Sequence, residues 1–429
     1  MSRRISSTTT KTERRPRSRK SGAAASMEYR KLFRYYEQQT VLPTYANLAD
    51  DAALARYVHG REMLFSDKLF LPPRIFRDAS MVEFGPDSGE NALVFARWGA
   101  RTTLVEPNER AHKYIRAYFE RFGLSESLRD IVAADVEAFA AREHASRVLA
   151  EFVDAEGFIY TIQPADLWLG AFAQLLRPGG FAIVSYYEKD AGFFEIALKA
   201  IYAAAKTISG RDPVDTAWAL YETKWNSIPH TRSFESWVMD VMENPFVRLK
   251  YFLDADALCN AAQRFGFSLY SSWPVYRAPL EIYWHKRVLP AEERRRRHSA
   301  HLARSHLSFM AGEELYLVGG LEQVDAANRA IAAAAQAMDQ TVESPTASSI
   351  KLSLAAVEAV KAAVQTTSVL ARNEQAPRNY IAVLEALKAA LTALLNGDFV
   401  VLCRMMRESQ ALVEHWGTPT HFAVFRRQY

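Results

Sequence analysis

The chain has 429 residues, of which 49% are hydrophobic and 24% are charged, and this is the composition of a globular protein with two or three domains. No apolar run approaches about eighteen residues, so we expect no transmembrane helix. The two cysteines, Cys259 and Cys403, lie far apart and match no zinc-binding spacing. We therefore expect no metal site and a reducing, cytoplasmic compartment.

The net charge of +4 is unevenly distributed along the chain. Residues 1–26 contain eight Lys or Arg and one acid, so this segment carries +7 and the rest of the chain −3. The segment is poor in apolar residues, which predicts a disordered basic tail. An over-called start before Met27 fits this composition, and a targeting or anionic-polymer-binding tail is the alternative. The four arginines at 294–297 follow Glu292 and Glu293 and indicate a solvated helix face, so nucleic acid is not an expected partner.

Apolar strands and helices alternate over residues 80–187. Strands are expected within 80–85, 101–108, 129–137, 150–158 and 181–187, and helices within 90–99, 108–123 and 165–176. This alternation predicts βαβ units and a parallel sheet. Residues 27–76 predict aromatic-rich helices, and two prolines at their end lead into the first strand.

The second half of the chain breaks this rhythm. Residues 188–253 are helical and aromatic, which predicts an insertion after the fifth strand. A helix within 254–266 and strands within 267–273 and 280–289 predict an antiparallel pair at the sheet edge. Residues 291–429 contain Ala-rich amphipathic helices, which predict an all-α C-terminal region. We expect a main domain over 27–290, and any homo-oligomer contacts are expected through the C-terminal helices.

The stretch MVEFGPDSGEN, residues 81–91, has the pattern of a strand, a glycine-bearing loop and the start of a helix. A dinucleotide-binding loop reads G-x-G-x-x-G, because its glycines let a pyrophosphate approach the backbone. Counted from Gly85, the other two glycine positions hold Asp87 and Glu90, and a carboxylate there would repel a pyrophosphate. No G-K-[ST] follows, so a P-loop is excluded as well.

The same stretch resembles the first motif of the class I S-adenosylmethionine-dependent methyltransferases, [E/D]-x-G-x-G-x-G after an apolar strand. Asp87 departs from the middle glycine, although Asp tolerates unusual backbone angles better than most residues. The resemblance covers residues 75–290 and implies a Rossmann-like α/β sheet with S-adenosylmethionine as cofactor. Acids are favourable near the sulfonium and ammonium of this cofactor. The expected contacts in the loop are Glu83, Gly85, Pro86, Asp87, Ser88 and Gly89.

The resemblance implies further cofactor contacts at the ends of the following strands. Glu106 matches the acid that accepts hydrogen bonds from the ribose hydroxyls, and Asp135 the acid that receives the adenine amino group. The fourth strand ends in the motif that lies under the methionine part. Structural roles are the alternatives for Asp135, as a helix cap, and for Glu83. The residues expected to make these contacts are Glu106, Pro107, Asp135, Val136, Glu156 and Gly157.

The acceptor is expected above the C-terminal ends of the strands, where the insertion begins. His230 lies in a loop of the insertion and is the expected general base, because histidine titrates near neutral pH; a packed or solvated histidine is the alternative. Tyr160, Tyr186 and Tyr187 are expected to line the acceptor pocket, or else to be ordinary core or rim aromatics. Arg232 is expected to meet an anionic acceptor, or else to form a surface ion pair.

We therefore expect an enzyme that methylates an oxygen or nitrogen of a small-molecule or sugar-like acceptor, with residues 188–253 as a lid. Methylation of protein or nucleic acid is the alternative among enzymes, and the charge of −3 outside the tail speaks against it. A non-catalytic scaffold with the same fold is the alternative outside enzymes. The presence of Glu83, Gly85, Gly89 and Glu106 together argues against a decayed site.

Overall fold

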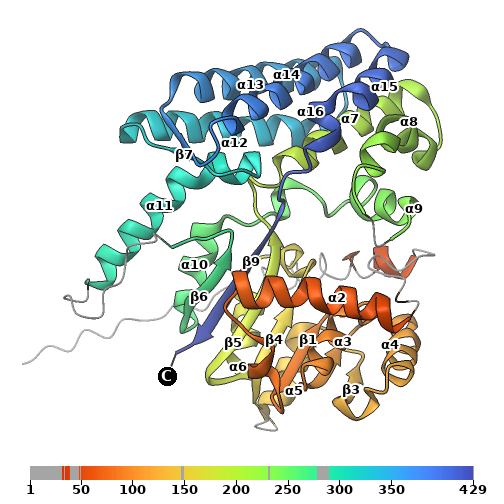
Figure 1. Ribbon diagram of the computed structural model, residues 1–429, viewed down its shortest axis with the longest axis vertical. Helices are drawn as coiled ribbons and strands as arrows, with labels where there is room; N and C mark the ends of the chain where they lie inside the picture. The colour runs from red at the N-terminus through yellow and green to blue at the C-terminus, as the bar shows by residue number, and fades with distance from the viewer. Residues whose placement is uncertain are drawn as a thin grey trace, which may run out of the picture.

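A computed structural model describes residues 31–32, 34–38, 48, 50–145, 149–229, 232–277 and 289–428. The predicted basic tail, residues 1–26, lies outside the described residues. Figure 1 shows a sheet flanked by helices in one half of the molecule and a body of helices in the other half. The C-terminal strand runs from the helical body back into the sheet.

Five parallel strands form the central part of the sheet, in the order β3-β2-β1-β4-β5. Glu83 on β1 is aligned with Leu104 on β2 and with Asp154 on β4. Because parallel strands end at the same edge, the loops after β1, β2 and β4 meet there, and ligands bind at this place in open α/β sheets. The strands are β1 (Ser80–Phe84), β2 (Arg101–Val105), β3 (Leu128–Val132), β4 (Ala150–Ala155) and β5 (Leu176–Tyr187).

Helices cover both faces of this sheet and bury its apolar side chains. Phe65 and Phe95 lie in the core of one face, and Phe139 and Phe172 in the core of the other. The first face is covered by α2 (Asp51–Met63), η1 (Leu64–Lys68), α3 (Glu90–Arg97) and α4 (Glu109–Arg121). The second is covered by α5 (Val136–Ala145), α6 (Asp166–Leu175) and α10 (Ala255–Arg264). Short 3-10 turns lie at η2 (Pro73–Phe76), η3 (Ser125–Ser127) and η4 (Ile159–Thr161).

The antiparallel edge of the sheet is confirmed, but one of its strands needs a correction. The strand β6 (Phe267–Trp273) pairs with β9 (Thr420–Arg427), which also pairs with β5. Of the strand expected within 280–289, residues 280–288 lie outside the described residues. The C-terminal region is therefore not all helical. Its last segment, THFAVFRR, forms a strand between β5 and β6 and buries Phe422 and Val424 in the core on one face of the sheet and Phe425 in the core on the other.

The helical body combines the insertion with the C-terminal helices. Helix α12 (Leu321–Glu343) packs against α7 (Phe193–Ser209), and α13 (Ala347–Thr366) packs between α12 and α14 (Ala376–Leu395). Arg248 of the insertion pairs with Asp339 of α12 at 2.7 Å, and the buried Lys224 donates to the carbonyl oxygen of Leu412 at 2.8 Å. The insertion contains α7 (Phe193–Ser209), α8 (Pro213–Trp225), α9 (Phe234–Trp237), η5 (Val238–Met242) and η6 (Leu249–Tyr251).

The C-terminal helices begin with a charged helix. Arg296 and Arg297 of α11 each contact Glu293 at 2.8 Å, as expected for a solvated face.

No helix in the described part of the chain has both the length and the apolar character of a membrane span. The remaining elements are α11 (Ala291–Ala311), β7 (Leu315–Leu317), α12 (Leu321–Glu343), α13 (Ala347–Thr366), β8 (Val369–Ala371), α14 (Ala376–Leu395), α15 (Phe399–Glu408) and α16 (Gln410–Glu414).

Removal of β9 should unfold the sheet. A chain ending at Gly417 loses the backbone hydrogen bonds to both β5 and β6. It also loses the burial of Phe422, Val424 and Phe425, and each of these buried side chains contributes about 1.5–3 kcal/mol. We expect loss of the near-ultraviolet circular dichroism signal and of a cooperative thermal transition. A chain ending at Arg427 is the control and should melt as the full chain does. An unchanged transition in the shorter chain would contradict the central place of β9.

Candidate functional site

The loop between β1 and α3 has the backbone conformation that its sequence requires. Gly85 and Gly89 have φ angles of 62° and 93°, and Asp87 has a φ of 49°, so all three lie in the left-handed region. A Cβ atom at Gly85 would come within 2.6 Å of the Phe158 ring, which leaves glycine as the residue that fits there. The amide of Gly89 bonds to the carbonyl oxygen of Pro86 at 2.8 Å, and this closes the loop at the start of α3.

Glu106 ties this loop to the end of β2. Its carboxylate accepts the amide of Asp87 at 3.2 Å and the amide of Asn108 at 2.8 Å. Pro107 lies between Glu106 and Asn108, which caps α4. Burial raises the pKa of Glu106 to about 8. The carboxylate is thus positioned by two backbone donors beside the glycine-bearing loop.

Asp135 and Ser88 make local contacts. The Asp135 carboxylate accepts the amide of Ala138 at 2.7 Å and starts α5, of which Val136 is the first and buried residue. Within the chain, Asp135 therefore caps a helix, which was the structural alternative to a contact with adenine. The Ser88 hydroxyl donates to the buried Glu90 carboxylate at 2.7 Å, so Ser88 holds the beginning of α3.

Buried acids gather at the ends of β1 and β4. Glu83 and Asp154 are neighbours across the two strands and are 2% and 0% exposed. One oxygen of Glu83 and both oxygens of Asp154 are buried and have no hydrogen-bond partner among the described residues. Burial, reinforced by the nearby Glu156, raises the pKa of Glu83 to about 8 and that of Asp154 well above its ordinary value. These raised pKa values mean that protons occupy the pair in the free chain, and a ligand that brings positive charge or hydrogen-bond donors can take their place.

One cation faces this group of acids. The guanidinium of Arg61, on α2, binds the Glu156 carboxylate through two contacts of 2.5 and 2.7 Å. It also lies over the ring of Phe65, at 4.8 Å from the centroid. Gly157, the next residue, has a φ of 79° and donates its amide to the hydroxyl of Ser185 at 2.8 Å. The bend after β4 is therefore held by an ion pair on one side and by β5 on the other.

Sequence reasoning missed Asp154 and Arg61. Asp154 is inside the strand segment AEFVDAEGF, whose acids at 154 and 156 alternate with apolar residues. An acid in a buried strand was a signal that could have been used, since an acid is seldom fully buried without a partner. Arg61 could not have been found, because its place depends on how α2 crosses the sheet (Figure 1).

Aromatic and charged residues gather next to this site, between the sheet and the insertion. Tyr160 and Tyr187 are stacked, with ring centroids 5.1 Å apart, and Phe252 packs edge-on against both. Arg232 binds Asp240 at 2.6 Å, and Asp240 also accepts the hydroxyl of Tyr36 at 3.0 Å. Burial raises the pKa of both stacked tyrosines well above 10, so these phenols are neutral.

Glu195 of α7 belongs to the same region and was also missed. One of its carboxylate oxygens is buried without a hydrogen-bond partner in the described part of the chain. Burial raises its pKa to about 7, and a hydrogen bond with Tyr187 opposes this shift. A carboxylate that titrates near neutral pH is suited to receiving a proton. No pattern in the sequence distinguishes Glu195 from the other acids of the insertion.

One of the predicted acceptor residues, Tyr186, does not belong to this group. Tyr186 is adjacent to Tyr187 on β5 and therefore points to the opposite face, where its hydroxyl meets that of Tyr276. The hydroxyl of Tyr276 contacts His421 on β9 at 2.8 Å. Tyr186 is thus a core residue of the sheet edge. His230 lies outside the described residues. Among those that are described, no group of His, Cys, Asp and Glu could hold a metal ion.

Replacement of Glu83 by Gln should change the pH dependence of stability. A folded-state pKa raised from 4.5 to about 8 means that the folded chain holds more protons, so unfolding becomes easier as pH rises through this window. Relative to the wild type, Glu83→Gln should gain stability between pH 4.5 and about 8, by at most about 1.4 kcal/mol per pH unit. Urea unfolding across this window measures the difference. Glu62→Gln, an exposed change on α2, is the control, and parallel curves for Glu83→Gln and the wild type would refute the prediction.

Residues 55–272 match the family model described as a methyltransferase domain. No curated protein matches the chain.

Several solved structures are similar at low identity. The chain resembles the SAM dependent methyltransferase from Agrobacterium tumefaciens with 14% identity and a TM-score of 0.25, over 32% of this chain and 44% of that chain. It resembles TehB from Haemophilus influenzae with 14% identity and a TM-score of 0.23, over 30% and 46% of the two chains. It resembles PKMT2 from Rickettsia typhi in complex with AdoHcy with 14% identity and a TM-score of 0.35, over 62% of this chain and 49% of that chain. Each match spans less than half of the other chain's length.

The family match decides the assignment, because it covers half of the chain and contains the glycine-bearing loop, the buried acids and strands β1 to β6. The sheet order β3-β2-β1-β4-β5-β9-β6, with two antiparallel pairings at one edge, is the Rossmann-like arrangement that the sequence resemblance implied. The chain therefore belongs to the class I methyltransferase family.

Proposed function

We propose that the chain transfers a methyl group from S-adenosylmethionine, the methyl donor of its family, to a small-molecule acceptor. The observation that carries this proposal is the pair Glu83 and Asp154, which are buried with unused carboxylate oxygens beside a loop of left-handed residues. Such a site repels a pyrophosphate and favours a ligand with ammonium and sulfonium groups. The residues present fit this cofactor.

Each part of the cofactor has a proposed partner in the chain. Glu106, held by the amides of Asp87 and Asn108, would accept the ribose hydroxyls. Glu83 and Asp154 would receive the ammonium group, and Asp135 with Val136 would border the adenine. The loop of Gly85, Pro86, Asp87, Ser88 and Gly89 and the bend of Glu156 and Gly157 would enclose the methionine part. When bound, the cofactor supplies an electrophilic methyl group on its sulfur.

The acceptor is proposed to bind between the end of β5 and the insertion. Tyr160 and Tyr187 offer neutral phenols, and Arg232 with Asp240 offers a fixed ion pair. Glu195 is proposed as the group that removes a proton from an acceptor hydroxyl or amine, because burial brings its pKa to about 7. The chain's own contribution to rate is then alignment of the acceptor, exclusion of water and removal of this proton.

A small acceptor is supported by how this region is enclosed. Tyr160 is 4% exposed and Phe252 is 7% exposed, and the helices of the insertion pack against them. A long polymer would have to displace these aromatic contacts to reach the cofactor. The lid role of residues 188–253 and oligomerisation through the C-terminal helices remain predictions.

The cofactor proposal is tested by calorimetry. Wild-type protein should bind S-adenosylmethionine and not NAD. Glu106→Gln keeps the side-chain volume but replaces one acceptor oxygen by a donor, so affinity should fall about tenfold to a hundredfold, the range expected for one or two hydrogen bonds to a charged group. Glu109→Gln, an exposed change on the first turn of α4, is the matched control. Unchanged affinity in Glu106→Gln would remove the ribose assignment.

The acceptor proposal is tested with labelled cofactor. The protein is incubated with methyl-labelled S-adenosylmethionine and either the small-molecule or the macromolecular fraction of a cell extract. We expect label in the small-molecule fraction, and a rate that rises with pH through about 7 as the Glu195 carboxylate forms. Glu195→Gln should abolish this pH dependence and lower the rate about a hundredfold, the lower end of the range of about 10²–10⁴ that is typical for an acid–base group. Its cofactor affinity should be unchanged. Label only in macromolecules would favour the polymer alternative.

A further inference from the structure

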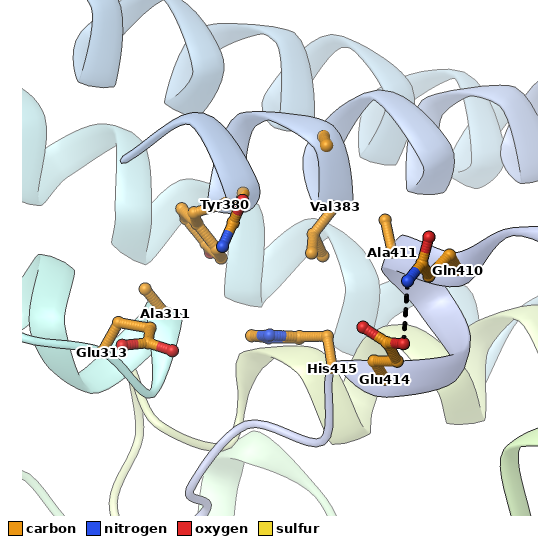
Figure 2. Close-up of a pocket in the computed structure, with 10 residues that line it drawn as sticks. Ala311, Glu313, Tyr380, Val383, Gln410, Ala411, Glu414 and His415 are labelled. Atoms are coloured by element: carbon orange, nitrogen blue, oxygen red, sulfur yellow. Dashed lines mark hydrogen bonds between the residues drawn. The ribbon is translucent and has the colours of Figure 1, made fainter. Parts of the chain in front are cut away.

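Buried polar atoms without a hydrogen-bond partner occur in both halves of the described chain. In the helical body, the Tyr380 hydroxyl and the Nε2 atom of His415 are of this kind, beside a cavity of about 480 Å³ that α11, α14 and α16 border (Figure 2). Their rings pack together, with centroids 5.9 Å apart, so these atoms belong to the packing of the body. The oxygens of Glu83 and Asp154 differ, because they lie at strand ends, where ligands approach an α/β sheet.

The positions of Glu83 and Asp154 disfavour two negative charges on this pair. The two residues are aligned on adjacent parallel strands, so their side chains leave the same face of the sheet about 4.8 Å apart, one strand spacing. One oxygen of Glu83 and both oxygens of Asp154 are buried without a donor among the described residues. Two carboxylates this close, without water or donors, do not both stay ionised, and the pair therefore retains a proton.

The groups that face the pair from the neighbouring elements are mostly acidic. Glu106 follows β2, Glu90 begins α3 and Glu156 follows β4, and the charge of each opposes ionisation of Glu83. Arg61 of α2 favours ionisation, but its guanidinium is bound by the Glu156 carboxylate through two contacts of 2.5 and 2.7 Å. The nearby cation is thus already paired with another acid.

The titration behaviour of these groups agrees with the geometry. Burial, followed by the charge of Glu156, raises the pKa of Glu83 to about 8 and that of Asp154 well above its ordinary value. Tyr57 of α2 also faces these acids, and its phenol is neutral because burial raises its pKa. Near neutral pH, the free chain therefore carries protons on Glu83 and Asp154.

We propose that S-adenosylmethionine enters this site in exchange for a proton. The inference rests on the function proposed above and concerns the regulation of the same site by pH. The ammonium group of the cofactor would bring a positive charge and N–H donors to the unused oxygens of Glu83 and Asp154. A carboxyl of the pair then becomes the favoured acceptor in its ionised form, and its proton leaves to the solvent.

The direction of the pH dependence follows from this exchange. The free chain holds more protons at the pair than the complex does, so cofactor affinity rises with pH. The rise ends near the pKa of Glu83 in the free chain, about 8, because above it this carboxyl is already ionised before the cofactor binds. Acidification therefore weakens the hold on the cofactor.

Glu106 is a second source of protons and has to be counted separately. Burial raises its pKa to about 8 as well, and the ribose hydroxyls are proposed to donate to it. The ligand 5′-methylthioadenosine contains the ribose and the adenine but no amino acid part, so any proton that it releases comes from outside the pair. S-adenosylhomocysteine contains the ammonium group but no sulfonium, so it separates the effects of these two charges.

The test is isothermal titration calorimetry of the full chain at about pH 7 in buffers of different ionisation enthalpy. The slope of the observed enthalpy against the buffer enthalpy gives the number of protons released. S-adenosylmethionine and S-adenosylhomocysteine should each release about one proton more than 5′-methylthioadenosine does. Between about pH 6 and pH 7, affinity for S-adenosylmethionine should rise up to about tenfold more than affinity for 5′-methylthioadenosine.

The variants Glu83→Gln and Asp154→Asn imitate the protonated side chains without a change of volume, so both should fold. In the double variant, S-adenosylmethionine should release no more protons than 5′-methylthioadenosine does. Glu62→Gln, an exposed change on α2, is the control and should release protons as the wild type does.

Three results would overturn this inference while leaving the proposed function in place. These are binding of S-adenosylmethionine with no more protons released than with 5′-methylthioadenosine, an extra release that persists in the double variant, and an extra release with S-adenosylmethionine that S-adenosylhomocysteine does not produce. The last result would assign the effect to the sulfonium. Absence of S-adenosylmethionine binding across the whole pH range would overturn the proposed function together with the inference.

Discussion

The burial of carboxylates at the ends of β1 and β4 is the constraint on which the rest of the site depends. Glu83 and Asp154 are aligned across the two strands, and Arg61 forms its ion pair with the neighbouring Glu156. Removing charged groups from water is costly unless they are paired, and burial accordingly raises the pKa of both acids, so that protons occupy the pair in the ligand-free chain. A cation that enters the site can take the place of these protons. This explains why acids, rather than further glycines, surround a loop that would otherwise suit a phosphate.

The same edge determines how the helical body is attached. β5 continues directly toward α7, and β9 returns from the body to pair with β5 and β6. The chain therefore passes between the sheet and the helical body four times, after β5, before α10, after β6 and before β9, and backbone hydrogen bonds hold β9 on both sides. Glu195 lies on α7, within hydrogen-bond reach of Tyr187 at the end of β5. A displacement of the helical body can therefore move the proposed acceptor region through α7 without moving the cofactor loop.

Most of the fold and about half of the site could be predicted from the sequence. The period of strands and helices over residues 80–187 identified the parallel sheet, and the loop at 81–91 identified the left-handed turn at Gly85, Asp87 and Gly89. The strand β9 was missed because it follows a long helical region and pairs with segments far away in sequence. Tyr186 was misplaced because two adjacent strand residues point to opposite faces. Contacts of this kind depend on the tertiary arrangement and leave no local pattern.

Buried charged groups have different partners in the two halves of the molecule, and this difference distinguishes the roles of the two halves. In the sheet, buried acids keep unused oxygens at the strand ends, where a ligand can approach. In the helical body, the buried amines of Lys199 and Lys224 bond to backbone carbonyl oxygens, and burial lowers the pKa of each to about 7. Those lysines donate hydrogen bonds to carbonyl oxygens at the ends of chain segments, so they stabilise the helical body rather than bind a ligand.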